Sequence, residues 1–198
     1  METSADLQAK WDARHRDGPP PEPAAVLELN AHLLPATGRA LDLACGLGGN
    51  ALFLAKRGLQ VDAWDLSPVA IQRLDAWSRA AKLPLVAQVR DLLMAPPPPD
   101  QFDLICVSHF LDRDLFPALG AALRPGGLLF YQTWSQDRVT GRGPSEARYR
   151  LAPNELLALT KGLLIRYYQE DGDRGDLTQG LRDLALMVAQ RPLERSQE

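Results

Sequence analysis

The chain has very little cysteine and no long apolar run, and both absences narrow what it can be. It holds 2 cysteines among 198 residues, too few for a disulfide framework, and their spacing suits no zinc site. No apolar stretch approaches the ~20 residues that span a bilayer. Residues 1–6 are polar and lack the apolar core of a secretion signal. We therefore expect a cytoplasmic protein with no membrane contact and no metal.

The chain also lacks a large excess of either positive or negative charge. The chain carries 22 basic and 25 acidic residues, a formal net charge of −3, so no broad cationic surface is expected for nucleic acid or an anionic membrane. With 45% hydrophobic residues, a chain of 198 can bury a full core and has the size of a single domain. These values favour one globular enzyme with a small-molecule partner, and they say nothing of its oligomeric state.

Segments of strand character alternate with helical segments along the chain, which predicts right-handed crossovers and a doubly wound sheet with helices on both faces. The last two strands are joined by a short segment rich in glycine and aspartate, and such a link predicts an antiparallel hairpin at one edge. The fold class is therefore α/β, with a mostly parallel seven-stranded sheet and a C-terminal antiparallel hairpin. The expected strands are 39–44, 60–65, 85–90, 102–107, 128–133, 163–169 and 183–189, and the expected helices are 6–16, 23–34, 49–57, 68–82, 114–123 and 151–160. Residues 1–38 are expected to form a helical cap and a proline-rich linker, and residues 39–198 the ligand-binding domain.

A glycine-rich turn links the first expected strand to a helix. Such a turn exposes backbone N–H groups at the carboxyl end of a parallel strand, where α/β folds bind nucleotides. Asp42 lies inside the strand just before the glycines, and Asp65 closes the next strand, where an acid binds ribose hydroxyls. The glycine spacing alone also fits a dinucleotide site. Asp42 would repel a pyrophosphate and attract an α-amino group, which favours S-adenosylmethionine. The alternative is that Asp42 only caps the turn.

Four segments in register resemble the motifs of the class I Rossmann-like S-adenosylmethionine-dependent methyltransferases, over roughly residues 39–190. They are Leu41–Gly48, Asp65–Pro68, Arg90–Leu92 and Leu123–Gly127. Asn50 stands where the family commonly has a third glycine. The resemblance implies that the turn holds the methionine part of the cofactor, that the acid ending the second strand binds the ribose, and that the third motif meets the adenine. The cofactor-binding residues so expected are Asp42, Ala44, Cys45, Gly46, Gly48, Asn50, Asp65, Leu66, Asp91, Leu92 and Ser108.

The short chain is most similar to small-molecule methyltransferases of the tellurite-resistance and thiopurine or thiol type. Trp11 and Arg14 resemble the N-terminal segment that covers the cofactor in such proteins, with the arginine meeting the cofactor carboxylate. The alternative is an amphipathic helix with Trp11 in the core and Arg14 in water. The implied acceptor is a small molecule, anionic or of thiol or chalcogen oxyanion type, and the product is S-adenosylhomocysteine.

The segment Ser108–Arg113 follows the fourth strand and faces the cofactor's methyl group in folds of this design. His109 is the best candidate for a base or acceptor contact, with Arg113 beside it, and the alternative is a loop histidine bonded to backbone. The 135–150 loop is rich in arginine, so it could close over an anionic acceptor or simply be solvated. Trp134 and Tyr149 flank it, either to stack on an acceptor ring or to anchor the loop.

Three functions remain open at this stage. The first is methyl transfer to a small acceptor by in-line displacement, in which precise alignment supplies much of the acceleration. The second is a non-catalytic S-adenosylmethionine-binding protein with a regulatory or assembly role. The third is a nicotinamide oxidoreductase, which Asp42, the C-terminal hairpin and the lack of chain for a second domain all disfavour.

Overall fold

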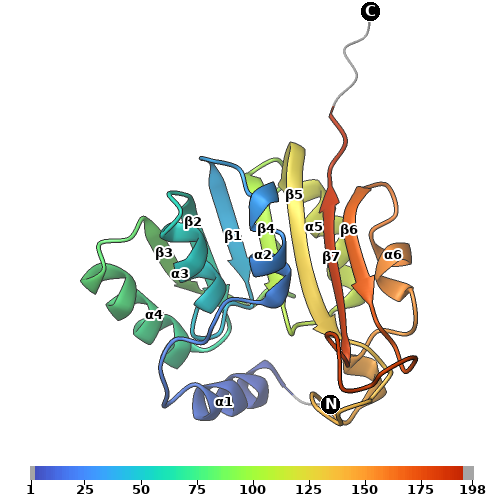
Figure 1. The fold of residues 1–198 in the computed structure, drawn as a ribbon. Coiled ribbons are helices and arrows are strands. Elements are labelled where there is room, and N and C mark those ends of the chain that lie inside the picture. The colour runs from blue at the N-terminus through green and yellow to red at the C-terminus, as the bar shows by residue number, and fades with distance from the viewer. Residues whose placement is uncertain (1–2, 194–198) are drawn as a thin grey trace, which may run out of the picture.

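The computed structural model describes residues 3–193 and contains a seven-stranded sheet in the order β3-β2-β1-β4-β5-β7-β6 (Figure 1). The strands from β1 to β5 pair in parallel, whereas β7 runs antiparallel to both β5 and β6. This arrangement confirms the predicted fold class, including the antiparallel hairpin. The strands are β1 (Arg39–Leu43), β2 (Gln60–Asp65), β3 (Leu85–Val89), β4 (Phe102–Ser108), β5 (Leu123–Trp134), β6 (Leu164–Glu170) and β7 (Leu184–Gln190).

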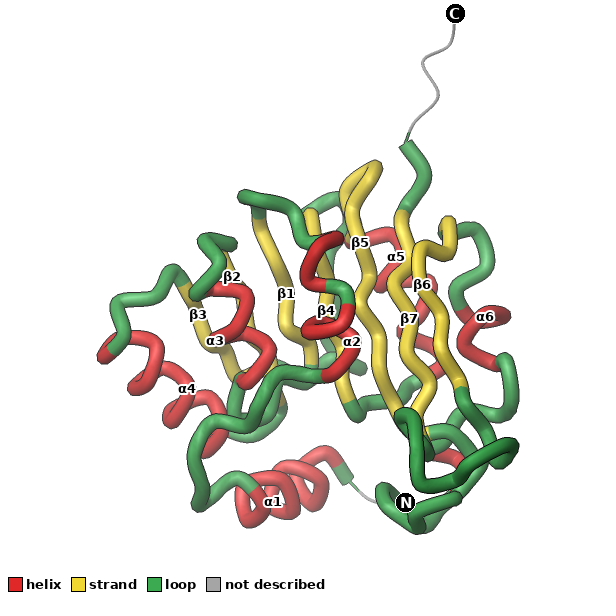
Figure 2. The backbone as a smooth tube through the Cα atoms, viewed as in Figure 1, coloured by secondary structure: helices red, strands yellow, loops and turns green. Residues whose placement is uncertain are grey.

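Helices cover both faces of the sheet (Figure 2). The helices α2, α3 and α4 pack on the face that buries Ala40, Cys106 and Phe130, while α5 and α6 pack on the face that buries Leu41 and Ile105. Successive strand residues point to opposite faces, so strands that are apolar throughout build a core on each side. The helices are α1 (Ser4–Arg14), α2 (Ala25–Leu29), α3 (Gly49–Ala55), α4 (Pro68–Ala80), α5 (Phe116–Ala122) and α6 (Glu155–Leu159), and the short 3₁₀ turns are Ala31–Leu33, Arg113–Leu115 and Ala147–Tyr149.

Several helix boundaries differ from the sequence predictions for local reasons. The helix expected over 23–34 ends at Leu29, where the Asn30 side chain donates to the Val26 carbonyl oxygen at 3.1 Å and competes with helix continuation. The helix expected over 151–160 starts only at Glu155, because a residue that precedes proline, here Ala152, is disfavoured in helical conformation. The start of α4 agrees with the predicted one, and the Ser67 hydroxyl caps it by accepting from the Ala70 N–H at 3.1 Å.

The fifth strand is longer than predicted. It was expected to begin at residue 128, yet β5 begins at Leu123 and already pairs there with Phe102 of β4. The pairing register shifts between Phe102 and Leu104, and Gly126 has φ = 83°. The residues between Leu123 and Leu128 therefore form a bulge within one strand.

The carboxyl ends of the parallel strands form one edge of the sheet, and α1 lies across this edge (Figure 1). The loop after β5 reaches the same edge, because Trp134 pairs with Leu184 at the start of β7. The N-terminal residues 23–34 are part of the same packed unit, since Val26 and Leu27 are fully buried in the core. Among residues 3–193, the structure contains no helix that is both long and apolar enough to cross a membrane.

Candidate active site

The turn after β1 has a backbone that favours small residues. Ala44, Gly46 and Gly48 have φ values of 54°, 51° and 77°, in the left-handed region that L side chains seldom adopt. A Cβ at Gly48 would lie 2.4 Å from the Leu74 side chain, so only glycine lets α4 pack this closely. The Gly48 N–H donates to the Cys45 carbonyl oxygen at 2.8 Å and keeps the turn tight. The cofactor contacts expected for these residues remain predictions.

Asp42 is fully buried beneath this turn. Its Oδ2 accepts from the Ala51 N–H at 3.0 Å, and its Oδ1 lies 3.4 Å from the Asn50 Nδ2. Burial raises the pKa of Asp42 to about 7, against the effect of these two hydrogen bonds. Within residues 3–193, no cationic side chain pairs with it. Asp42 therefore accepts from an N–H in the first turn of α3, and it is also an acid that a cation placed nearby would stabilise in its charged form.

Asp65 and Asp91 end β2 and follow β3 at the same edge. The Asp65 carboxylate accepts from the backbone N–H of Gly46 and of Ser67, both at 2.8 Å, so it links the two motif turns. Asp91 accepts from the Ser4 hydroxyl at 2.7 Å, and this hydrogen bond holds the pKa of Asp91 below its usual value. Both carboxylates therefore lie at the carboxyl ends of the parallel strands, and their contacts with ribose and adenine remain predictions.

Asn50 uses its side chain within the protein. Its Oδ1 accepts from the Ala24 N–H at 2.8 Å, and its Nδ2 donates to the Ser108 hydroxyl at 2.9 Å. Leu92 is buried in the core, so only its backbone is available to a ligand, as the resemblance implies. Leu66 is partly buried next to Asp65. The cofactor roles expected for Asn50, Ser108, Leu66 and Leu92 have not been tested by these contacts.

The end of α1 covers the glycine turn. The Ser67 hydroxyl donates to Asp12 Oδ1, and Arg73 donates to the His15 carbonyl oxygen at 2.8 Å. The His15 ring packs against Gly46, because a Cβ added there would be 3.1 Å from its Cε1 atom. Burial lowers the pKa of His15, while the nearby Asp65 acts in the opposite direction. The sequence analysis missed both Asp12 and His15, since only the folding of α1 over the edge brings them here.

Trp11 and Arg14 lie on this helix, but Trp11 is 36% exposed and α1 contains no buried residue. The alternative that placed Trp11 in the core is therefore wrong. The Trp11 ring stacks on His15 with centroids 5.7 Å apart, and the Arg14 Cζ lies 5.8 Å from the centroid of the Trp11 ring. Contact of either residue with a cofactor remains a prediction.

His109 follows β4 and is held in place by β5. Its backbone N–H donates to the Gln132 carbonyl oxygen at 2.8 Å, its Nε2 lies 3.3 Å from the Gln132 Nε2, and its φ is 55°. The Trp134 ring lies beside it with centroids 4.8 Å apart. His109 is exposed to solvent, yet desolvation by these neighbours lowers its pKa, and Arg142 lowers it further. Gln132, a buried amide in an apolar strand, was a sequence signal that the analysis missed.

Arg113 was expected to act with His109, but its guanidinium is engaged elsewhere. Its Nε contacts Glu155 Oε1 at 2.6 Å, and its two terminal nitrogens donate to the carbonyl oxygens of Arg148 and Arg150 at 2.8 and 3.0 Å. These contacts tie the 135–150 loop to α6. They favour a structural role for Arg113, and its catalytic role stays a prediction without support from the geometry.

The arginines of the 135–150 loop differ sharply in their surroundings. Arg150 is 1% exposed, and its guanidinium donates to backbone carbonyl oxygens, including that of Ser135 at 2.6 Å. Arg148 pairs with Glu146, and Arg138 donates to the Gly141 carbonyl oxygen. Arg142 is exposed and close enough to His109 to lower its pKa, and its guanidinium has no ion pair or hydrogen bond within residues 3–193. The loop is thus not uniformly solvated, because Arg150 is buried while Arg142 is exposed.

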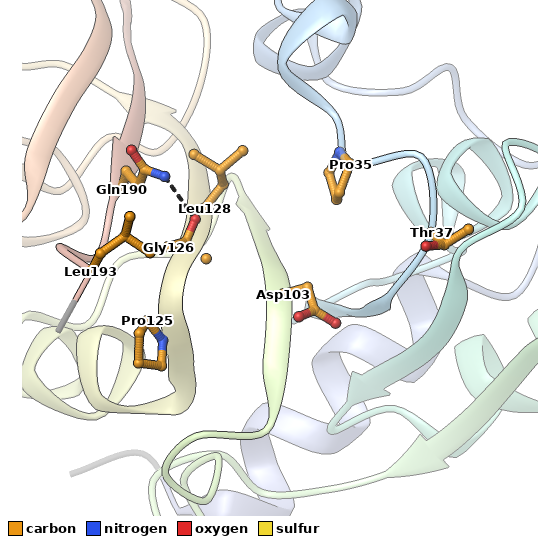
Figure 3. A pocket seen from close by; sticks show the side chains of 9 residues that line it. Pro35, Thr37, Asp103, Pro125, Gly126, Leu128, Gln190 and Leu193 are labelled. Carbon is orange, nitrogen blue, oxygen red and sulfur yellow. Dashed lines mark hydrogen bonds between the residues drawn. The ribbon is translucent and has the colours of Figure 1, made fainter. Parts of the chain in front are cut away.

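A hollow of about 330 Å³ lies at the opposite edge of the sheet (Figure 3). It is lined by Pro35 and Thr37 ahead of β1, by Asp103, and by Gly126 and Leu193. These residues lie at the amino ends of the parallel strands, away from every site residue that the sequence predicts. The Asp103 carboxylate there accepts from the Arg39 N–H at 2.7 Å and from the Arg124 side chain at 2.9 Å, so hydrogen bonds within the protein already satisfy it.

Comparison with known proteins identifies the family. Residues 40–127 match the model of a methyltransferase domain. The chain is 33% identical over 193 residues to a ubiquinone biosynthesis O-methyltransferase of Xanthomonas axonopodis pv. citri (strain 306), covering 90% of this chain and 75% of that protein. A ubiquinone biosynthesis O-methyltransferase of Stutzerimonas stutzeri (strain A1501) is 26% identical over 182 residues, covering 79% of this chain and 78% of that one.

Solved structures give the same result for the fold. TehB from Haemophilus influenzae superposes with a TM-score of 0.68 at 22% identity, covering 84% of this chain and 61% of that one. A protein solved for the conversion of a disulfide bond into a thioacetal group during echinomycin biosynthesis has a TM-score of 0.71 at 25% identity, covering 96% of this chain and 94% of that one. The chain therefore belongs to the class I S-adenosylmethionine-dependent methyltransferases, and it is an enzyme that uses this cofactor.

The residues at the carboxyl edge fit this cofactor. The Asp65 carboxylate would supply hydrogen-bond acceptors for a ribose, and Asp42 would supply an acid for the cationic amino group. The backbone path at Ala44 and Gly46 keeps bulky side chains out of the turn. When bound, S-adenosylmethionine supplies an electrophilic methyl group on a sulfonium.

Proposed function

We propose that the protein transfers the methyl group to an oxygen atom of a small anionic aromatic acceptor. The observation that carries this proposal is the group formed by His109, Trp134 and Arg142 at the ends of β4 and β5, beside Ser108. A histidine can contact the reacting oxygen, a tryptophan ring can stack on an aromatic acceptor, and an arginine without a partner can bind its negative charge.

The relatives support an oxygen acceptor, since two of them are named ubiquinone biosynthesis O-methyltransferases. The sequence analysis expected a small acceptor that is anionic or of thiol or chalcogen oxyanion type. The likeness to TehB at 22% identity supports the fold alone. In either case the reaction is an in-line displacement. The acceptor lone pair forms the new bond to the methyl carbon, and the carbon–sulfur bond breaks with its electron pair left on sulfur.

On this proposal the protein's own residues bind and align the two reactants. Asp65 holds the ribose and Asp42 holds the amino group, so the sulfonium faces the end of β4. His109 and Arg142 hold the acceptor oxygen and its charge on the other side. Alignment of this kind can supply a large part of the rate acceleration without a strong base.

An acceptor screen with labelled S-adenosylmethionine tests the proposal. Phenols and catechols that carry a carboxylate should be methylated faster than thiols, tellurite or selenite. His109→Ala should lower turnover of the best acceptor and leave the affinity for S-adenosylhomocysteine unchanged. Preferred methylation of a thiol or of tellurite would contradict the oxygen acceptor. Binding of the cofactor with no turnover of any acceptor would favour the regulatory alternative.

A further inference from the structure

Gln132 lies near the end of β5, 3% exposed, and bridges two parts of the molecule that are distant in sequence. Its Oε1 accepts from the backbone N–H of Val26, in the first turn of α2, at 3.0 Å. A backbone amide nitrogen can only donate, so this contact fixes which end of the side-chain amide is the oxygen. The other end, Nε2, is therefore an NH₂ group with no lone pair to offer.

The Gln132 Nε2 lies 3.3 Å from the Nε2 of His109. Because the Gln132 NH₂ can only donate, the His109 Nε2 must accept, and its ring proton must then be on Nδ1. From this geometry we infer that Gln132 is a positioning residue that holds His109 as the Nδ1–H tautomer, so that His109 donates a hydrogen bond to the acceptor oxygen and is not the base that takes its proton.

Neighbouring contacts hold the backbone of His109 and pack against its ring in this position. The backbone N–H of His109 donates to the carbonyl oxygen of the same Gln132 at 2.8 Å, and Trp134 lies against the ring. The Tyr131 hydroxyl donates to the Phe110 carbonyl oxygen at 2.7 Å and fixes the next residue. An imidazolium would bring an N–H against the Gln132 NH₂, and Arg142 also disfavours the cation. Within residues 3–193, the His109 Nδ1 has no hydrogen-bond partner.

This inference rests on the proposed function, because it assumes that the acceptor binds beside His109. A donor at Nδ1, together with Arg142, suits an oxygen that reaches the site already ionised, its proton having gone to solvent. The oxyanion's lone pair then forms the oxygen–carbon bond as the carbon–sulfur bond breaks, and no proton passes to the protein. The rate should therefore follow ionisation of the acceptor.

Side-chain nitrogen NMR of the protein bound to S-adenosylhomocysteine measures the tautomer without any acceptor. The wild-type protein at pH 7 should show His109 neutral with its proton on Nδ1. Gln132→Glu replaces the NH₂ by a second oxygen, which accepts, so the His109 proton should move from Nδ1 to Nε2. Gln72→Glu, at an exposed position on α4, introduces the same charge and should leave the His109 signals unchanged.

Turnover provides the second readout. Gln132→Glu should lower kcat by about tenfold or more, since a hydrogen bond to a charged oxygen is lost, and should leave the affinity for S-adenosylhomocysteine unchanged. With acceptors of different acidity, the rising limb of kcat/KM against pH should move with the acceptor's pKa. A wild-type His109 that carries its proton on Nε2, or a rising limb that stays fixed across acceptors, would overturn the inference. Failure to find an oxygen acceptor would refute the proposed function and leave the tautomer measurement standing.

Discussion

The two halves of the sheet edge differ in charge. The ends of β1, β2 and β3 carry the acids Asp42, Asp65 and Asp91, whereas the region after β4 and β5 carries His109 and Arg142. The acidic half suits a cofactor that has a sulfonium and an amino group, and the other half suits an anionic acceptor. On the proposed function, the fold would bring a cationic methyl donor to the first half and an anionic acceptor to the second.

The two halves also differ in how they are built. In the acidic half, Asp42 and Asp65 bond backbone N–H groups of the neighbouring motif turns, while Asp91 bonds the Leu93 N–H and the distant Ser4 hydroxyl. The other half, formed by the residues that follow β4 and β5, is called the acceptor half here. It depends on contacts between residues distant in sequence, such as those of Gln132 with Val26 and of Arg113 with Glu155. Changes to the first half should therefore alter cofactor affinity, and changes to the second should alter turnover.

The largest expected effect is on cofactor binding in Asp65→Ala. If the Asp65 carboxylate binds the ribose as proposed, its loss should weaken binding of S-adenosylhomocysteine by about 100-fold, from roughly two hydrogen bonds to a charged group. Isothermal titration calorimetry measures this loss of affinity. Asp103→Ala is the matched control, because Asp103 also accepts from a backbone N–H, at 2.7 Å, but at the opposite edge. Equal affinity in Asp65→Ala and the wild type would remove Asp65 from the site.

The second largest expected effect is on acceptor binding, and it distinguishes the acceptor half from the acidic half. Arg142→Gln should raise KM for an anionic acceptor by about tenfold or more, because a charge-assisted contact is lost, with no change in affinity for S-adenosylhomocysteine. Arg148→Gln removes the same charge from the same loop, where Arg148 pairs with Glu146 at 2.8 Å, and should leave KM unchanged. A similar rise in KM for both variants would mean that only the net charge of the loop matters.

Cofactor affinity should also depend on pH through Asp42. Burial raises the pKa of Asp42 to about 7, so the acid is mostly protonated at pH 6 and mostly ionised at pH 8. Only the ionised form attracts the amino group, and the affinity for S-adenosylhomocysteine should therefore fall about tenfold per unit below that pKa. Calorimetry in buffers of different ionisation enthalpy should detect proton release on binding near pH 7. Asp42→Asn should bind weakly and show neither effect.

The raised pKa of Asp42 also makes the free energy of unfolding depend on pH. The folded protein keeps the Asp42 proton at pH values where the unfolded chain, with an ordinary pKa of 3.8, has lost it. The stabilisation from this group is therefore fully present below pH 3.8 and is lost as the pH rises through about 7. Asp42→Asn should remove this contribution from the pH dependence of the unfolding free energy. An unchanged pH dependence would contradict the shift.

The smallest expected effect is on how firmly α1 is held over the glycine turn that follows β1. Arg73→Ala removes donors to the carbonyl oxygens of His15 and Gly18, which should cost about 1 kcal/mol of local stability and speed dissociation of S-adenosylhomocysteine a few-fold. Amide hydrogen exchange of residues 4–18 should rise in this variant. Arg79→Ala, on the same helix and paired only with Asp75 at the surface, is the control. Unchanged exchange in Arg73→Ala would show that α1 is held by other contacts.

The sequence predicted most of the fold and the acidic half of the edge. Strand residues that are apolar on both faces and glycine turns such as the one at Gly46 are local signals, so their elements follow from short stretches of chain. The contacts around His109 could not be predicted in this way, because Gln132 and Val26 meet only after the sheet has formed. His15 reaches Gly46 only because α1 folds over the edge, and Arg150 is buried only because backbone carbonyl oxygens converge on it.

A crystal structure of the protein with S-adenosylhomocysteine would test the charge division of this edge. The ribose hydroxyls should bond to Asp65, the amino group should face Asp42, and the sulfur should point toward His109. A ribose bound away from Asp65, or an amino group far from Asp42, would contradict the assignment of the acidic half to the cofactor.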